Sequence, residues 1–221
     1  YFAFSSSRNA EQNQVWVGMS KETAHQLGTP LSSLMGWVEY LKTSKVDASI
    51  VEEISKDVSR LETITDRFSK IGSDPKFETV SVKKVIEPVI SYLRTRISDK
   101  VKITIVGDDF HCLNLCVPLF EWVIENLTKN AVDAMEGQGD FSISIKKIKD
   151  QLIIDLKDTG KGISKKDFKK VFKPGFTSKK RGWGLGLSLV RRIIEDHHYG
   201  KIFVKSSEVG AGTVFRIEMP I

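Results

Sequence analysis

Two stretches near the N-terminus repeat apolar residues at the spacing of an amphipathic helix. In residues 10–43 and again in residues 47–72 the apolar positions lie three or four residues apart. Positions 44–49 carry Ser, Lys, Asp and Ser, which suits a short connection between helices. Gly72 and Pro75 follow the second stretch, where a helix is expected to end. The apolar positions are Val17, Ala24, Leu27, Leu31, Leu34, Val38 and Leu41, with Ser20 as a polar member of the same series, then Ile54, Val58, Leu61, Ile64, Phe68 and Ile71.

This pattern predicts an all-α antiparallel helical hairpin. A single hairpin leaves much of its apolar stripe exposed to water. Pairing with a second copy would bury the stripe in a four-helix bundle, so we predict a homodimer.

The pattern changes from residue 78 onward, where helical and alternating segments follow one another. Helices are predicted at 82–97, 117–136 and 184–198, and strands at 101–106, 141–147, 151–157, 201–206 and 213–219. A Gly- and Lys-rich irregular stretch covers 158–183. Mostly antiparallel strands with separate helices indicate an α+β sandwich in which helices cover one face of the sheet.

Composition excludes several classes of protein. The chain has 221 residues and a formal charge of +6, which is too mild to indicate a nucleic-acid partner. Cys112 and Cys116 are too few for a metal site and are interpreted as reduced thiols in a reducing compartment. No run of eighteen apolar residues is present. Residues 1–4 are apolar and Arg8 follows, which fits either the cytoplasmic end of a membrane segment or an artificial or frayed terminus.

His25 is the first candidate for chemistry. It lies one residue beside the apolar stripe, so its imidazole is expected to face solvent, and Thr29 lies one turn away on the same side. Gly28 and Pro30 weaken the helix there. A neutral imidazole is a competent nucleophile toward phosphorus. The alternative is a surface histidine beside a helix kink.

Asn126 and Asn130 are the next candidates. They lie one helical turn apart, so both amides face the same way, and amide oxygens are suitable ligands or anchors for Mg²⁺. Two asparagines on an ordinary helix are the alternative.

Glycine-rich segments carry the remaining candidates. Asp158 directly follows a predicted strand, and its carboxylate can accept a hydrogen bond from an adenine amino group, while Gly160 and Gly162 let the backbone pass close to the base. Lys and Arg dominate residues 161–181, and we select Lys179 as a phosphate contact within a mobile lid. Gly182, Gly184 and Gly186 lead into a helix, where backbone N–H groups can converge on phosphate. An ordinary turn and a solvated basic loop remain the alternatives.

Together these motifs resemble a known family. The order His25, Thr29, Pro30, Leu31 at the start of a helical hairpin resembles the phosphoacceptor box of sensor histidine kinases. The later segments resemble, in order, the ATP-binding domain that these kinases share with gyrase, Hsp90 and MutL. The residues that this resemblance assigns to ATP are Asn126, Asn130, Asp133, Asp158, Gly160, Gly162, Lys179, Gly182, Gly184, Gly186 and Thr213, with Asn126 and Asn130 also assigned to Mg²⁺.

The resemblance implies an activity and an organisation. It implies ATP-dependent autophosphorylation of His25, transfer of the phosphoryl group to an Asp of a response-regulator receiver domain, and use of Thr29 in dephosphorylating that partner. It divides the chain into a membrane-proximal signalling segment (1–18), a dimerisation and phosphoacceptor hairpin (19–74) and a catalytic domain (78–221). The chain would be the cytoplasmic portion of an inner-membrane protein, attached through a segment that precedes residue 1.

Departures from the family pattern keep alternatives open. The family usually has Glu or Asp after the histidine, whereas Gln26 cannot take a proton and can only orient the ring through a hydrogen bond. This residue favours slow autophosphorylation, a different base, or a nucleotide-binding pseudokinase scaffold. Asn126 stands where the ATPase relatives have Glu, which opposes a gyrase- or Hsp90-type ATPase. Asp133 stands where many of these kinases have Lys, and Trp183 is bulkier than the usual Thr or Ser.

Overall fold

The computed structural model describes residues 27, 30–44, 46–71, 76–108, 110–178 and 184–221. The chain divides into two compact units, Tyr1–Pro75 and Lys76–Ile221. Five of the predicted site residues lie outside the described residues: His25, Gln26, Thr29, Lys179 and Gly182.

The described residues of the first unit form two helices, one over residues 30–42 and α2 over Ala48–Ile71. Asp47 begins α2: its carboxylate accepts hydrogen bonds from the backbone N–H of Ser49 at 2.9 Å and from its hydroxyl at 2.8 Å. These hydrogen bonds lower the pKa of Asp47. The predicted second helix, 47–72, is confirmed to within a residue at each end, and the predicted first helix can be compared only over its described part.

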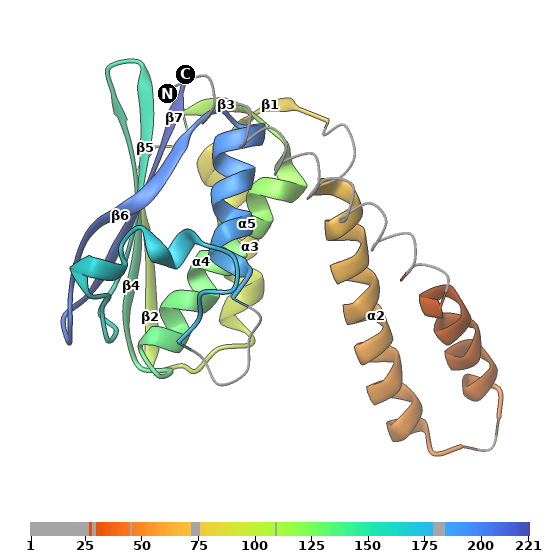
Figure 1. The fold of residues 1–221 in the computed structure, drawn as a ribbon. Helices are drawn as coiled ribbons and strands as arrows, with labels where there is room; N and C mark the ends of the chain where they lie inside the picture. The colour runs from red at the N-terminus through yellow and green to blue at the C-terminus, as the bar shows by residue number, and fades with distance from the viewer. Residues whose placement is uncertain (1–26, 28–29, 45, 72–75, 109, 179–183) are drawn as a thin grey trace. The chain divides into compact units, whose positions relative to one another are not determined.

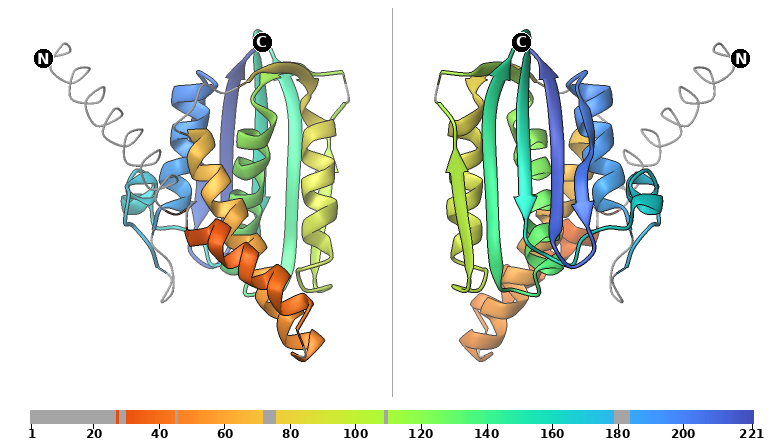
Figure 2. Two further views of the ribbon diagram at one scale, coloured as in Figure 1. Left: turned by 90° about the vertical axis from the view of Figure 1, so that its right-hand side faces the viewer. Right: turned by 90° about the vertical axis from the view of Figure 1, so that its left-hand side faces the viewer.

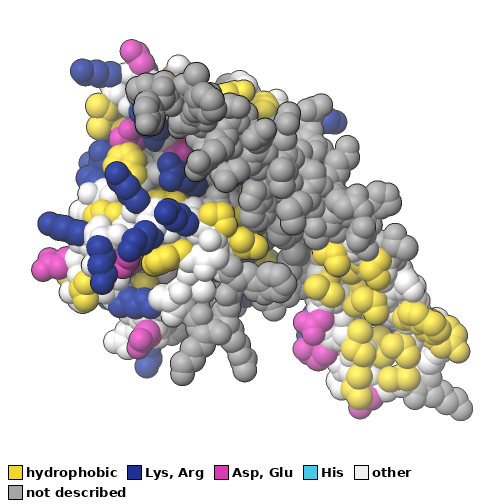
Figure 3. All heavy atoms as spheres, in the orientation of Figure 1, with side chains coloured by type: hydrophobic (Ala, Val, Ile, Leu, Met, Phe, Trp, Pro, Cys, Tyr) yellow, Lys and Arg dark blue, Asp and Glu magenta, His cyan; other side chains and the backbone are white. Residues whose placement is uncertain are grey.

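Among the described residues of this unit, only part of the predicted apolar stripe is buried within one chain. Leu31, Val38 and Val58 form a buried cluster between the two helices. Other large apolar side chains are exposed, and Figure 3 shows them gathered on the surface of this unit: Leu27, Leu34, Met35, Trp37, Tyr40, Val46, Ile50, Ile54 and Leu61.

The second unit is a five-stranded sheet covered on one face by helices (Figures 1 and 2). The strand order is β2-β4-β5-β7-β6, in which β2 is parallel to β4 and the other pairs are antiparallel. The strands are β2 (Val101–Val106), β4 (Gly139–Ile148), β5 (Gln151–Asp158), β6 (Lys201–Glu208) and β7 (Gly212–Pro220). The helices are α3 (Val82–Arg94), α4 (Val117–Ala134) and α5 (Gly186–Arg192). The predicted two-layer unit of helices on a mostly antiparallel sheet is confirmed.

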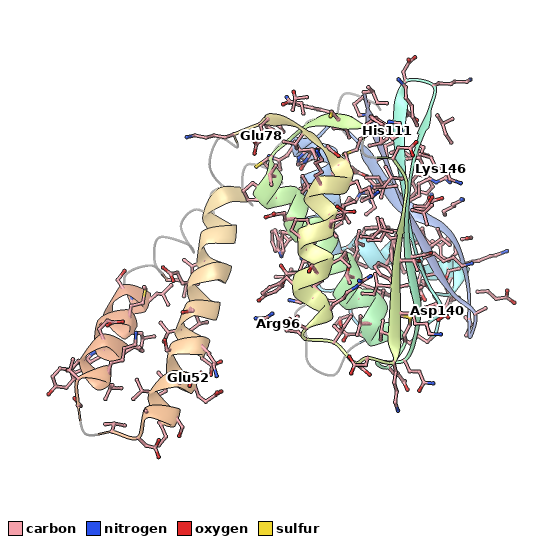
Figure 4. The ribbon with its side chains drawn as sticks, turned by 180° about the vertical axis from the view of Figure 1, so that it is seen from behind. Glu52, Glu78, Arg96, His111, Asp140 and Lys146 are labelled. Atoms are coloured by element: carbon pink, nitrogen blue, oxygen red, sulfur yellow. The ribbon has the colours of Figure 1, made fainter. Side chains whose placement is uncertain are left out.

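The core lies between the helices and the sheet. Alternate residues of the strands point toward the helices, as the period of two requires, and Ile143, Ile154 and Ile217 are completely buried. Phe120 and Val123 of α4 are equally buried. The opposite face of the sheet is mostly polar, and Figure 4 shows Lys146 of β4 projecting from it, away from the helices.

Several boundaries differ from the predictions. β1 (Glu78–Ser81) and β3 (Cys112–Leu115) form a separate antiparallel pair that was not predicted, because four residues are too few to establish an alternating pattern. The helix predicted at 184–198 begins at Gly186 and changes at Ile193 into a π-helical turn that ends at His197. The irregular stretch contains two 3₁₀ turns, Lys165–Asp167 and Lys170–Phe172. No described helix has both the length and the apolar composition needed to cross a bilayer.

Candidate functional site

Asp158 is the last residue of β5 and one of few buried charged groups among the described residues. Its side chain is 3% exposed, and one carboxylate oxygen accepts a hydrogen bond from the backbone N–H of Gly160 at 2.8 Å. Removal from water raises the pKa of Asp158, while hydrogen bonds from the backbone of Gly160 and Thr213 act against this effect. Figure 4 labels Asp140 at this end of the sheet; its neighbour Phe141 pairs with Asp158.

The turn after Asp158 is built so that only glycine fits. A Cβ atom on Gly160 would lie 2.6 Å from the carbonyl oxygen of Ala134, at the end of α4, and the N–H of Lys161 donates to that oxygen at 2.9 Å. Gly162 has φ +72°, and a Cβ there would overlap the carbonyl oxygen of Glu208. The backbone of this turn is therefore held against α4 on one side and β6 on the other.

The asparagines lie on α4, as predicted. Asn126 is half-buried and donates from its amide nitrogen to the carbonyl of Trp122 at 3.1 Å. Its amide oxygen lies 3.0 Å from the position that a Cβ of Gly186 would take, so the start of α5 passes close to this oxygen. Asn130 is half-buried one turn further along α4, and Asp133 is exposed.

Metal binding at this site would depend on these amides. Within the described part of the chain, no three His, Cys, Asp or Glu side chains gather in a way that could hold an ion. Mg²⁺ usually keeps several waters and takes one or two protein ligands together with substrate phosphates. An amide oxygen on α4 fits that role without any acidic cluster.

The basic segment is anchored beside the glycine-rich segment. The N–H of Gly175 donates to the carbonyl oxygen of Gly184 at 3.0 Å, and a Cβ on Gly184, where φ is +65°, would lie 2.5 Å from the backbone of Gly175. Phe172 is buried and its ring meets Phe215 of β7 edge to face. The ammonium group of Lys161 donates to Ser178 at 3.2 Å. The described parts of the two predicted phosphate-binding segments thus lie side by side.

Thr213 lies at the start of β7, directly opposite Asp158 in the sheet register, and is buried. Its hydroxyl oxygen is 2.9 Å from that of Ser207 on β6. Sequence reasoning missed Ser207, which also accepts the N–H of Ile163 at 2.7 Å. The sequence does show two adjacent serines, Ser206 and Ser207, at the end of an alternating strand, which points to a hydroxyl near the site. It does not show which of the two serines faces inward.

The structure brings together Asn126, Gly160, Gly162, Gly184, Gly186, Asp158 and Thr213 through neighbouring contacts of α4, β5, α5 and β7. A buried acceptor at a strand end, bordered by turns without side chains, can bind a flat base that carries an amino group. Glycine backbones beside a basic segment can bind the attached phosphates.

Comparison with known proteins agrees with this geometry. Residues 118–221 match the family described as "Histidine kinase-, DNA gyrase B-, and HSP90-like ATPase".

Relatives extend the match into the first unit. Sporulation kinase E of Bacillus subtilis is 32% identical over 206 residues, which are 90% of this chain and 28% of the relative. Sensor histidine kinase ZraS of Salmonella typhimurium is 30% identical over 207 residues, which are 90% of this chain and 44% of the relative. The solved structure of histidine kinase ThkA in complex with the response regulator protein TrrA shares the fold, with a TM-score of 0.63 and 23% identity over all of this chain and 66% of that one.

The chain thus spans less than half the length of these two curated relatives. The similarities support a sensor histidine kinase whose ATP-binding domain is of the gyrase and Hsp90 type, which confirms the resemblance found in the motifs.

Proposed function

We propose that this chain uses Mg-ATP to phosphorylate its own His25 and then passes the phosphoryl group to an Asp of a response-regulator receiver domain. The observation that carries the proposal is the buried carboxylate of Asp158 at the end of β5, bordered by glycines whose Cβ positions are occupied by backbone. A site of this kind can accept an adenine, and side chains at the glycine positions would not fit, as the family match on residues 118–221 leads us to expect.

We assign the two ends of the nucleotide to different elements. Asp158 and Thr213 would contact the adenine end, and Gly160 and Gly162 would border the base. Gly184 and Gly186 would lie along the phosphates, together with Lys179 and Gly182 from the segment that precedes Gly184. Asn126 and Asn130, with Asp133 at the end of the same helix, would hold Mg²⁺ directly or through water, and the ion would neutralise phosphate charge.

The chemical step needs an imidazole nitrogen and a base. The nitrogen of His25 attacks the γ-phosphorus, the bond from the bridging oxygen to that phosphorus breaks, and ADP leaves, while the ring loses its N–H proton. Gln26 can accept a hydrogen bond from the ring but cannot remove the proton, so the proton must pass to water or to another group. Thr29 would help to position a water molecule that dephosphorylates the receiver domain, which would be a phosphatase activity.

The first unit would serve as the dimerisation and phosphoacceptor hairpin, over residues 19–74, with a signalling segment at 1–18 before it and the catalytic domain over 78–221. The exposed apolar side chains of the two described helices support a homodimeric four-helix bundle, because a second copy would bury them. A receiver domain then docks on this hairpin, which is consistent with the partner present in the ThkA structure.

One reaction separates this function from its two rivals. We would incubate the chain with Mg²⁺ and γ-labelled ATP and measure protein-bound label and free phosphate in the same samples. Acid-labile, base-stable label on the protein supports the kinase. Free phosphate without protein label indicates an ATPase, and nucleotide binding with neither product indicates a pseudokinase scaffold.

A further inference from the structure

Ser207 is brought into the site by a β-bulge. Val204 of β6 lies opposite Phe215, but the next pair is Ser206 with Val214, so Lys205 is an extra residue without a partner in the register. The bulge reverses the alternation of the strand beyond it. As a result Ser206 is exposed, whereas Ser207 lies opposite Thr213, on the same face as Val204 and Phe215. Lys205 reaches the opposite face, where its ammonium group donates to Asp155 at 2.9 Å.

The single hydroxyl of Ser207 connects three separate groups. It accepts the backbone N–H of Ile163 at 2.7 Å, donates to the carbonyl oxygen of Gly212 at 2.9 Å, and lies 2.9 Å from the hydroxyl oxygen of Thr213. Ile163 closes the turn that follows Asp158, and Gly212 begins β7. Ser207 therefore joins the two backbone segments that border the adenine end of the proposed site.

These contacts determine the direction of the hydroxyl protons. A hydroxyl has one proton, and the carbonyl oxygen of Gly212 can only accept, so the proton of Ser207 is used there. The hydrogen bond between the two hydroxyls must then use the proton of Thr213. Once that proton points to Ser207, Thr213 has only lone pairs left to offer a ligand. The carboxylate of Asp158, ionised, also offers only acceptors.

We propose that Ser207 is a positioning residue that sets the base specificity of the site: by taking the proton of Thr213, it makes the Asp158–Thr213 end recognise a purine with a 6-amino group and reject one with a 6-oxo group. This inference rests on the proposed nucleotide-binding function. An acceptor-only site pairs with an amino donor, whereas a 6-oxo purine would place an acceptor against acceptors and leave buried groups without partners.

The test compares ADP with inosine diphosphate, in which a 6-oxo group replaces the 6-amino group and N1 carries a proton, by calorimetry on the 221-residue chain. We expect the parent to prefer ADP. In Ser207→Ala the hydroxyl of Thr213 is released and can donate to the 6-oxo group, so the preference for ADP should fall about tenfold, the size of one buried hydrogen bond. Ser207→Thr should keep the parental preference because it retains a hydroxyl. Ser206→Ala, an exposed serine one residue away, is the matched control and should leave the preference unchanged.

Two results would overturn the inference alone. If Ser207→Ala weakens ADP and inosine diphosphate by the same factor, Ser207 only holds the backbone together, and if the preference does not change, Ser207 has no part in recognition. Ser207→Cys, which keeps a side chain of similar size but whose sulfur is only a weak acceptor, provides the same comparison if Ser207→Ala does not melt cooperatively. A parent chain that binds neither nucleotide would overturn the proposed function, and this inference with it.

Discussion

Replacing Asp158 with asparagine tests whether its carboxylate serves nucleotide binding or the stability of the fold. The carboxylate is 3% exposed and its pKa is raised, mainly by its removal from water, so the folded state at neutral pH holds a charge at an unfavourable position. Asparagine has the same shape and can still accept the N–H of Gly160, but it replaces the second acceptor with a donor. We therefore expect Asp158→Asn to lose affinity for ADP without losing stability.

The size of the loss follows from the bond removed. A hydrogen bond to a charged group contributes about 1.5–3 kcal/mol, which corresponds to a roughly ten- to hundredfold increase in Kd. At an ADP concentration of about 100 times the parental Kd, the ligand stabilises the parent by about 2.7 kcal/mol. With a Kd about 30 times higher, the same concentration would stabilise Asp158→Asn by under about 1 kcal/mol.

The assay is thermal unfolding with and without ADP, beside Asp155→Asn as a matched control. Asp155 lies on the same strand but on the polar face. Although burial by itself raises its pKa, hydrogen bonds from Arg216 at 2.7 Å and from Lys205 lower the pKa overall. Its loss should destabilise the protein by about 1 kcal/mol and leave the shift caused by ADP intact. The reasoning would be refuted if Asp158→Asn kept the full ADP shift, or if it melted well below the parent without nucleotide.

Three further predictions concern the backbone, the pH response and the apolar surface. Gly162→Ala should lower the free energy of unfolding in urea by about 1–2 kcal/mol or more beyond the loss in Gly210→Ala, because both residues have positive φ but only at Gly162 would a Cβ overlap backbone. Equal losses in the two variants would contradict this. Burial lowers the pKa of His198, whose ring accepts the N–H of Cys116, so the stability that the neutral ring contributes should be complete above pH 6.5 and fall as the pH drops below it. Melting at pH 8 and pH 5.5 should show a smaller fall in His198→Gln than in the parent. Leu34→Glu, at an exposed position of the first helix, should shift sedimentation toward the monomer without unfolding either unit; an unchanged dimer would contradict the proposed bundle.

Patterns that act locally were predictable from sequence. The alternation on either side of Lys149 and Asp150 predicted the hairpin of β4 and β5, and Lys149 adopts φ 53°, as a tight turn requires. Glycines after Asp158 indicate a close approach of the backbone, and Gly160 and Gly162 do have backbone atoms where a Cβ would be.

Features that depend on the register between distant segments were not predictable. Whether Ser206 or Ser207 faces inward depends on the bulge at Lys205, and a single bulge reverses the face of every later residue on the strand. The contact of Gly160 with Ala134 likewise joins the end of a helix to a turn more than twenty residues later. The pair β1 and β3 was missed because neither strand is long enough to show a period.

His25 remains the centre of the proposed function, and labelling with γ-labelled ATP and Mg²⁺ tests it most directly. We would compare the parent chain with His25→Ala and Gln26→Glu. The account predicts acid-labile, base-stable label that disappears in His25→Ala and that forms at least as fast in Gln26→Glu, where a carboxylate can take the imidazole proton. Label that persists in His25→Ala, or a parent and a Gln26→Glu variant that bind nucleotide but carry no label, would contradict it.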